Sequence, residues 1–101
     1  MAEVASGPIE VEIAGMRLRF QQADPGLVQI HEMPGETWAA NAFNFEHEHG
    51  PLLYPNFAYH DRIGADDRDP RGNKTRPAIR EAARRVYVPR PGATQQAEPT
   101  P

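Results

Sequence analysis

Apolar and polar residues alternate strictly over residues 9–20, on both sides of the glycine at position 15. Two runs of period two around a short turn predict an antiparallel β-hairpin with one buried face. With Ala14 and Gly15 in the turn, the apolar face consists of three cross-strand pairs, Ile13–Met16, Val11–Leu18 and Ile9–Phe20. A four-residue loop would keep the same parity and is an equal alternative, because Ala14 disfavours the positive φ of a two-residue turn. The other face pairs opposite charges, Glu12 with Arg17 and Glu10 with Arg19. A shift of one residue would destroy both faces, so we expect this register.

The apolar positions after the turn sequence Asp24-Pro25-Gly26 predict a third strand over residues 27–33. To extend the apolar face of the hairpin, Val28 is expected beside Phe20 and Ile30 beside Leu18. His31 then falls opposite Arg17. These three strands form an antiparallel meander with one apolar side.

The pattern over residues 36–48 fits either a helix or a strand. Alternation of Phe43, Phe45, His47 and His49 favours a strand over 41–48, preceded by a short helical turn over 36–40. The choice between helix and strand over 36–45 stays open. Residues 52–63 contain Pro55, which restricts them to an edge strand or an extended loop. Six of the eight aromatic residues lie between positions 38 and 59, where we expect them to form the second half of the core.

Helical spacing of apolar residues returns after a polar loop over residues 64–74. Thr75 is the expected N-cap, with Pro77 in the first turn and a helix end near Val88, before Pro89. The apolar stripe of this helix is formed by Ile79, Ala82, Ala83, Val86 and Tyr87.

These elements predict an α+β fold, an antiparallel sheet of three or four strands with one C-terminal helix packed on its apolar face. The expected organisation is a disordered N-terminus over residues 1–7, a single domain over 8–88 and a disordered Pro-rich tail over 89–101. A domain of this size buries a modest share of its surface, so a homodimer is compatible with it.

The composition limits the cellular setting. The 101 residues include no cysteine, which excludes disulfides and thiolate metal sites. The chain has no apolar run near the ~20 residues that a membrane span requires, so no membrane partner is expected. The N-terminus lacks the basic start and apolar stretch of a secretory signal. These features together favour a cytoplasmic location.

The net charge of −3 is unevenly distributed, because acidic residues dominate positions 1–61 and basic residues dominate positions 62–90. Arg76, Arg80 and Arg84 form a stripe at helical spacing. We expect the interface with a partner protein that has an acidic surface to consist of Arg71, Lys74, Arg76, Arg80, Arg84 and Arg85. The same basic helix is the candidate for an alternative function, binding of nucleic acid phosphates.

Histidine spacing suggests a second alternative. His47 and His49 lie two residues apart, so on a strand they would point the same way, and His60 or Glu46 could supply a third ligand to a divalent metal. The His-x-His step resembles one fragment of the cupin metal motif. Leu52, Leu53 and Tyr54 occupy the region in which that motif has a glutamate.

No nucleophile, catalytic triad or phosphate-binding glycine loop has a recognisable setting in this sequence, so no catalytic residue is predicted. An enzyme is not excluded, but the pattern favours a non-enzymatic protein without a cofactor. The leading hypothesis is a small binding or inhibitory protein, of the type carried by mobile elements, that acts through a protein–protein surface.

Overall fold

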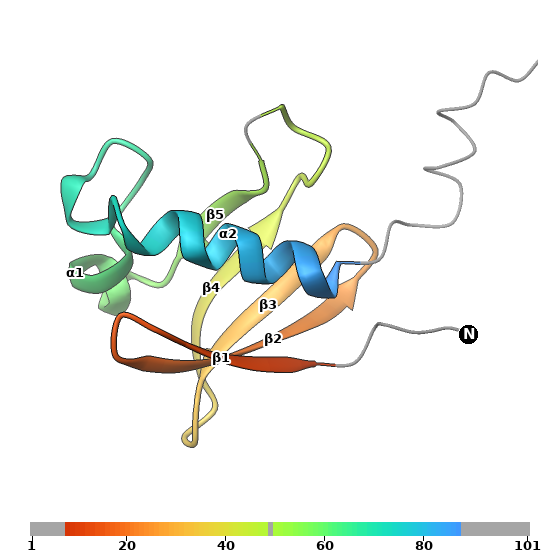
Figure 1. Cartoon of the computed structure of the whole chain (residues 1–101), viewed down its shortest axis with the longest axis horizontal. Coiled ribbons are helices and arrows are strands. Elements are labelled where there is room, and N and C mark those ends of the chain that lie inside the picture. Colours follow the sequence, from red (N-terminus) through yellow and green to blue (C-terminus); the bar gives the residue numbers. More distant parts are fainter. Residues whose placement is uncertain (1–7, 49, 88–101) are drawn as a thin grey trace, which may run out of the picture.

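A computed structural model describes residues 8–48 and 50–87 of the chain. The strands are β1 (Ile9–Ile13), β2 (Met16–Asp24), β3 (Leu27–Glu32), β4 (Thr37–Phe43) and β5 (Leu52–Pro55). The helical elements are the 3-10 turns η1 (Phe57–Tyr59) and η2 (Pro70–Gly72) and the α-helices α1 (His60–Ile63) and α2 (Thr75–Val86). The strands form one antiparallel sheet in the order β1-β2-β3-β4-β5, and α2 runs across one of its faces (Figure 1).

The α+β class, the antiparallel sheet and the helix packed on it are confirmed. The predicted size of the sheet is wrong, since it has five strands rather than three or four. The second α-helix, α1, was not predicted. The predicted segments 1–7 and 89–101, together with Val88, lie outside the described residues.

The register of the β1–β2 hairpin is confirmed. Ile13 faces Met16, Val11 faces Leu18 and Ile9 faces Phe20, as the apolar alternation requires. The turn has two residues, and both have positive φ angles, 52° at Ala14 and 79° at Gly15. Positive φ at both central positions is the geometry that matches the right-handed twist of the strands.

The predicted register of β3 is wrong by two residues. Ile30 lies opposite Phe20, and His31 lies opposite Arg19 rather than Arg17. β2 continues to Asp24, which pairs with Leu27, so the turn lies further along the chain than predicted. An irregularity between Gln22 and Asp24 keeps Phe20 and Ile30 on one face.

Residues 36–48 also differ from their prediction. The strand β4 covers Thr37–Phe43, so the expected helical turn over 36–40 is strand, and residues 44–48 form turns instead of continuing a strand. A register shift between β3 and β4 pairs Ile30 with Ala40 and His31 with Trp38, which leaves Ala39 as an extra residue. Such a bulge breaks the period of two, and this is why the sequence pattern was ambiguous here.

The core lies between the sheet and α2. Met16, Leu18 and Phe20 of β2 are completely buried, and Ile79 and Val86 of α2 are buried with them. The helix begins one residue before the expected position, because Lys74 rather than Thr75 is its N-cap, and it ends at Val86. Of the six aromatic residues expected in the core, only Tyr59 is fully part of it.

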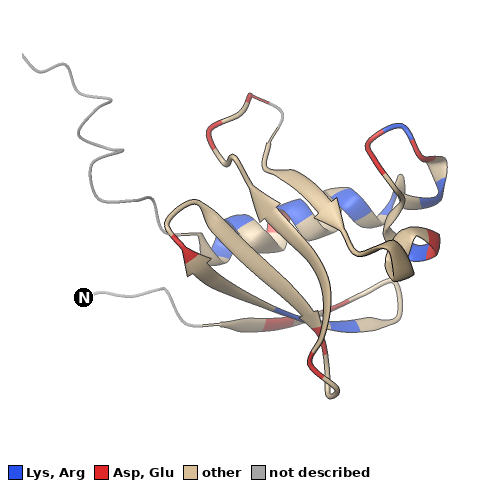
Figure 2. Ribbon diagram, turned by 180° about the vertical axis from the view of Figure 1, so that it is seen from behind, with Lys and Arg blue, Asp and Glu red and all other residues tan. Residues whose placement is uncertain are grey.

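Among the described residues, no element covers the face of the sheet opposite α2 (Figures 1 and 2). We call it the open face, and the strand register assigns to it Glu10, Glu12, Arg17, Arg19, Gln21, Asp24, Leu27, Gln29, His31, Trp38, Asn41, Phe43, Leu52 and Tyr54. Within the described residues, no helix has the length and apolarity needed to cross a bilayer.

Candidate binding surfaces

The part of the open face on β3, β4 and β5 combines large apolar side chains with amides. Tyr54 is 63% exposed and Phe43 is 37% exposed. The rings of Trp38 and Tyr54 lie with their centroids 6.3 Å apart and tilted by 42°. Leu27 and Leu52 flank Phe43 on the neighbouring strands. We call this part of the open face the aromatic surface.

A polar contact fixes the central ring of the aromatic surface. The indole Nε1 of Trp38 donates a hydrogen bond of 2.9 Å to Oδ1 of Asn41. Asn56 holds the same residue from the backbone side, because its Nδ2 donates to the carbonyl oxygen of Trp38 at 2.9 Å. The two contacts hold the indole and the backbone of Trp38 in one arrangement.

Charge is distributed unevenly over the open face. The open-face residues of β3 to β5 include no Asp, Glu, Lys or Arg, and the middle strands are correspondingly uncoloured in Figure 2. The charged residues of this face lie on β1 and β2, where Glu10 and Glu12 are opposite Arg19 and Arg17 and Asp24 is opposite Leu27. Arg19 lies beside His31, and the buried Nε of Arg19 and Nδ1 of His31 have no hydrogen-bond partner among the described residues.

The arginine stripe predicted to be an interface holds loops in place. Arg84 donates to the carbonyl oxygen of Gly50, and Arg80 donates to that of Pro51 at 3.0 Å and to the carboxylate of Asp67. The contacts with Gly50 and Pro51 attach α2 to the loop between β4 and β5, and the contact with Asp67 attaches it to the loop after α1. The carbonyl groups of a loop need such partners because few backbone donors are within reach.

Arg76 is the most buried of these arginines, with 3% of its surface exposed. Its Nη1 donates to the carbonyl oxygen of Ile63 at 3.0 Å, and its Nη2 donates to that of Asp67 at 2.8 Å. The guanidinium lies against Gly64 and Gly72, and a Cβ at either glycine would collide with it. Arg76 therefore joins α1, the following loop and α2 from the inside, and is not presented to a partner.

The other basic residues of the predicted interface are on the surface. Arg71 binds the carboxylates of Asp69 and Asp61, both at 2.7 Å. The hydrogen bonds from Arg71 and from the backbone N–H of Ala65 hold the pKa of Asp69 well below its usual range. Lys74, Arg84 and Arg85 are exposed. That these six residues bind a partner stays a prediction, and three of them, Arg76, Arg80 and Arg84, hold loops.

The structure does not bring the predicted metal ligands together. His47 lies in the turn after β4, whereas His60 opens α1, beyond the end of β5. These are opposite ends of the β4–β5 hairpin, separated by about 13 Å or more at 3.3 Å per residue. His49 lies outside the described residues. Over residues 8–48 and 50–87, no three His, Asp or Glu side chains are grouped as a metal ion would require.

Tyr59 and Glu32 form a contact between η1 and β3. The Tyr59 hydroxyl donates to Oε1 of Glu32 at 2.8 Å, and Arg62 lies 3.4 Å from the other carboxylate oxygen. Burial, followed by this hydrogen bond, raises the pKa of Tyr59 to about 12. The contact joins η1 to the last residue of β3.

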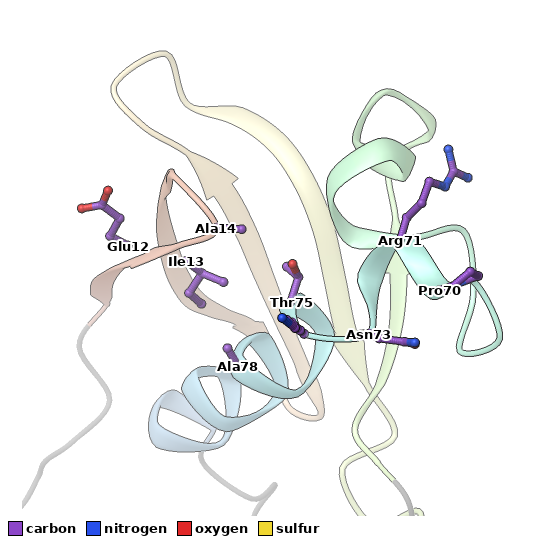
Figure 3. A pocket seen from close by; sticks show the side chains of 9 residues that line it. Glu12, Ile13, Ala14, Pro70, Arg71, Asn73, Thr75 and Ala78 are labelled. Atoms are coloured by element: carbon purple, nitrogen blue, oxygen red, sulfur yellow. The ribbon is translucent and has the colours of Figure 1, made fainter.

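A cavity of about 760 Å³ lies between the β1–β2 turn and the start of α2 (Figure 3). Ile13, Ala14 and Ala78 contribute apolar walls, and Asn73, Lys74 and Thr75 contribute polar groups. Of the residues that line the cavity, Arg71 and Lys74 belong to the interface predicted from the sequence. The cavity forms because the β1–β2 turn lies beside the start of α2. A contact between segments so far apart in the sequence cannot be predicted from local patterns.

Comparison with protein-family models, with curated proteins and with solved structures finds no match for this chain.

Proposed function

We propose that this chain is a binding protein that recognises a protein partner through the aromatic surface of its sheet. The observation that carries the proposal is the exposure of Tyr54 and Phe43 beside Trp38, on the part of the open face that β3, β4 and β5 form without charged residues. Tyr, Trp and Phe are enriched at the centres of protein interfaces, whereas charged residues are depleted there. The amides of Gln29 and Asn41 add hydrogen-bonding capacity between the apolar groups.

The absence of charge on this surface favours a protein over a nucleic acid. Aromatic residues on a sheet can stack on bases, but affinity for nucleic acids depends mainly on Lys and Arg beside the phosphates. The nearest cations on this face, Arg17 and Arg19, belong to β2, whose partner strand β1 places Glu12 and Glu10 opposite them. The basic residues of α2 lie on the other side of the sheet (Figure 2).

The location of this surface differs from the one that the sequence suggested. The sequence placed the interface on the arginines of α2, and the proposal moves it to the sheet because Arg76, Arg80 and Arg84 are occupied by loop contacts. Trp and Tyr side chains that are held in place commonly supply most of the energy of an interface. Trp38 and Tyr54 are accordingly the expected energetic centre.

The proposal is tested by site-specific photocrosslinking. A photoreactive phenylalanine analogue at Tyr54 is expected to attach covalently to a partner protein in cells that contain the chain. The same analogue at Glu81, on the solvent side of α2, serves as the matched control and is expected to give no such adduct. With the identified partner purified, Tyr54→Ala should weaken binding at least tenfold, corresponding to about 1.4 kcal/mol.

Three results would contradict the proposal. Crosslinking from position 81 but not from position 54 would show that the partner binds α2 and not the sheet. Nuclease-sensitive adducts would show that the partner is a nucleic acid. Unchanged affinity of the purified partner for both Tyr54→Ala and Trp38→Ala would remove the aromatic surface from the interface.

A further inference from the structure

The outer side of β1 presents backbone groups that have no strand to pair with. β1 forms one edge of the sheet, and among the described residues no strand lies beyond it (Figure 1). The two-residue turn makes Ile13 and Met16 a hydrogen-bonded pair, and hydrogen-bonded and non-bonded pairs alternate along an antiparallel ladder. The N–H and C=O groups of Glu10 and Glu12 therefore point away from β2, and none of them has a partner within the described residues.

The other edge of the sheet, β5, is protected against pairing. Pro55 lies within β5 and Pro51 lies just before it, and a proline has no N–H to offer to a further strand. Arg80 and Arg84 occupy the carbonyl groups of Pro51 and Gly50. β1 has no proline or lysine, and its register with β2 is regular, so it lacks most devices that protect an edge strand.

The side chains of β1 define which strand would fit beside it. Glu10 and Glu12 are exposed, and their carboxylates make no ion pair within the described residues although an arginine of β2 lies opposite each. Figure 3 shows the Glu12 carboxylate extending away from the hairpin. On the opposite face, Ile9 and Val11 are only partly buried against the core. A fitting strand therefore has basic residues beside the carboxylates and apolar residues beside Ile9 and Val11.

The cavity of Figure 3 lies at the end of this edge. Its hairpin walls are Glu12, Ile13 and Ala14, so it adjoins β1 rather than β2, and Ala78 of α2 adds an apolar wall. Residues directly opposite each other on neighbouring strands point to the same face. A residue opposite Ile13 on an added strand would therefore direct its side chain toward α2 and into the cavity. The volume of about 760 Å³ is sufficient for an apolar side chain.

A second copy of this chain does not have the required charges. Two copies of β1 that pair along their length with their apolar faces aligned would place glutamates of the two chains opposite each other. Like charges directly opposite are destabilising in a sheet. Charge complementarity instead favours a strand with Lys or Arg at alternate positions, as β2 has with Arg17 and Arg19.

We propose that β1 binds an extended segment of a partner protein, which adds to the sheet as a further antiparallel strand. The segment alternates apolar residues with Lys or Arg, and its basic residues exchange backbone hydrogen bonds with Glu10 and Glu12. In strand addition, the main-chain bonds supply affinity and the alternating side chains supply specificity. The proposal does not rest on the aromatic surface, because β2 separates β1 from β3, β4 and β5.

The test is a titration of the isotope-labelled full chain with a synthetic peptide, Thr-Val-Lys-Val-Arg-Val-Thr, blocked at both ends. The amide signals of Glu10 and Glu12 are expected to shift further than all others and to reach saturation. Exchange of these two amide protons with solvent should become slower, since both become hydrogen-bonded. The peptide Thr-Val-Glu-Val-Glu-Val-Thr is the charge-reversed control and is expected not to bind.

Methylation of peptide nitrogens separates strand pairing from general attraction between charges. Methyl groups on the backbone nitrogens of Lys and Arg remove the donors to the carbonyl groups of Glu10 and Glu12. They should weaken binding about tenfold or more, although the charge of the peptide is unchanged. A methyl group on the nitrogen of the central Val faces away from β1 and should leave the affinity nearly unchanged.

Variants of the chain test the role of the two carboxylates. Glu10→Gln combined with Glu12→Gln is expected to weaken binding about fivefold, because it removes both cross-strand charge pairs. Glu36→Gln combined with Glu81→Gln removes an equal charge from exposed positions outside β1 and should leave the affinity unchanged. The amide spectra of both double variants should show folded proteins.

The proposal fails if the amide shifts stay linear up to the solubility limit of the peptide. It also fails if methylation at Lys and Arg weakens binding no more than methylation at the central Val, since binding is then attraction between charges alone. Largest shifts at Trp38 and Tyr54 would place the peptide on the aromatic surface. Shifts of Glu10 and Glu12 that depend on the concentration of the chain alone would show that a second copy pairs with β1 instead.

Discussion

At the scale of single residues, Arg76 has the largest structural role of any charged group described above. Replacing it by Met keeps an unbranched side chain but removes the donors to the carbonyl oxygens of Ile63 and Asp67. Each buried acceptor left without a partner costs about 1–3 kcal/mol. We expect Arg76→Met to lower the free energy of unfolding by about 3 kcal/mol, as measured by urea denaturation.

Arg85→Met is the matched control for this measurement. Arg85 is exposed on the same helix and makes no ion pair within the described residues. Its replacement should change the free energy of unfolding by less than about 0.5 kcal/mol. Equal effects of the two replacements would show that Arg76 acts through helix charge and not through its buried hydrogen bonds.

The arginine stripe also marks a limit of prediction from sequence. The helical spacing of Arg76, Arg80 and Arg84 correctly placed them on α2, but it does not show what lies beside them. Their partners are carbonyl groups of residues that lie between 9 and 34 positions away in the sequence. A carbonyl group is present at every position, so the sequence carries no signal for such a contact. The same residues were therefore interpreted as an exposed binding face.

At the scale of elements, the turn of the β1–β2 hairpin holds Ala14 in a strained backbone conformation that a substitution could relieve. Ala14 has a φ of 52°, in the left-handed region that costs a residue with a Cβ about 1 kcal/mol. Asn tolerates this conformation and is the favoured first residue of such a turn. Ala14→Asn is expected to raise the free energy of unfolding by about 0.5–1 kcal/mol.

Chemical denaturation of Ala14→Asn and of Ala23→Asn provides the comparison. Ala23 is exposed near the end of β2 and does not have a positive φ, so its replacement should not stabilise the chain. A gain for both variants would indicate an effect of Asn on the unfolded state instead of relief of strain in the turn.

The bounds and register of some elements could be predicted from the sequence, and those of others could not. The hairpin was predicted to the residue because its two runs alternate without interruption. β4 was misread because the extra residue Ala39 changes the phase of the alternation, so that Ala39 and Ala40 are both buried although they are adjacent. A pattern with a fixed period cannot represent such a bulge.

At the scale of the whole molecule, a network of charged side chains makes the free energy of unfolding depend on pH in the acidic range. Asp69 accepts hydrogen bonds from Arg71, and Arg71 also binds Asp61 of α1. The pKa of Asp69 lies below its ordinary value of 3.8 because of these contacts. A lowered folded pKa gives stability that is complete above the ordinary value and is lost as the pH falls toward the folded one.

We therefore expect the melting temperature to fall as the pH is lowered below about 4, and Asp69→Asn to reduce this dependence. The variant should already be less stable at neutral pH, where the carboxylate makes its full contribution. Parallel melting curves of the two proteins from pH 6 to acid provide the measurement. An acid-induced loss of the same size in Asp69→Asn would assign it to other carboxylates.

The arrangement of the whole molecule explains why its surfaces were harder to predict than its fold. Period and turn signals were sufficient for a sheet with a helix across it. The aromatic surface arises because Trp38, Phe43 and Tyr54 lie on the side of the sheet opposite α2, where residues 8–48 and 50–87 supply no second layer. The composition of this segment instead suggested a core. Whether a face of the sheet is exposed depends on how many layers the fold has. The pattern within a single strand does not contain that information.

The contacts of α2 with loop carbonyl groups have a consequence for the evolution of this chain. A side chain that bonds to the backbone has a partner that substitution cannot remove, so compensating changes are rarely available at positions 76, 80 and 84. Homologous chains should retain arginine at these positions whatever they bind. Invariance of these three arginines would therefore reflect the requirements of folding. Under the proposed function, the residues at positions 38 and 54 would instead vary with the partner protein.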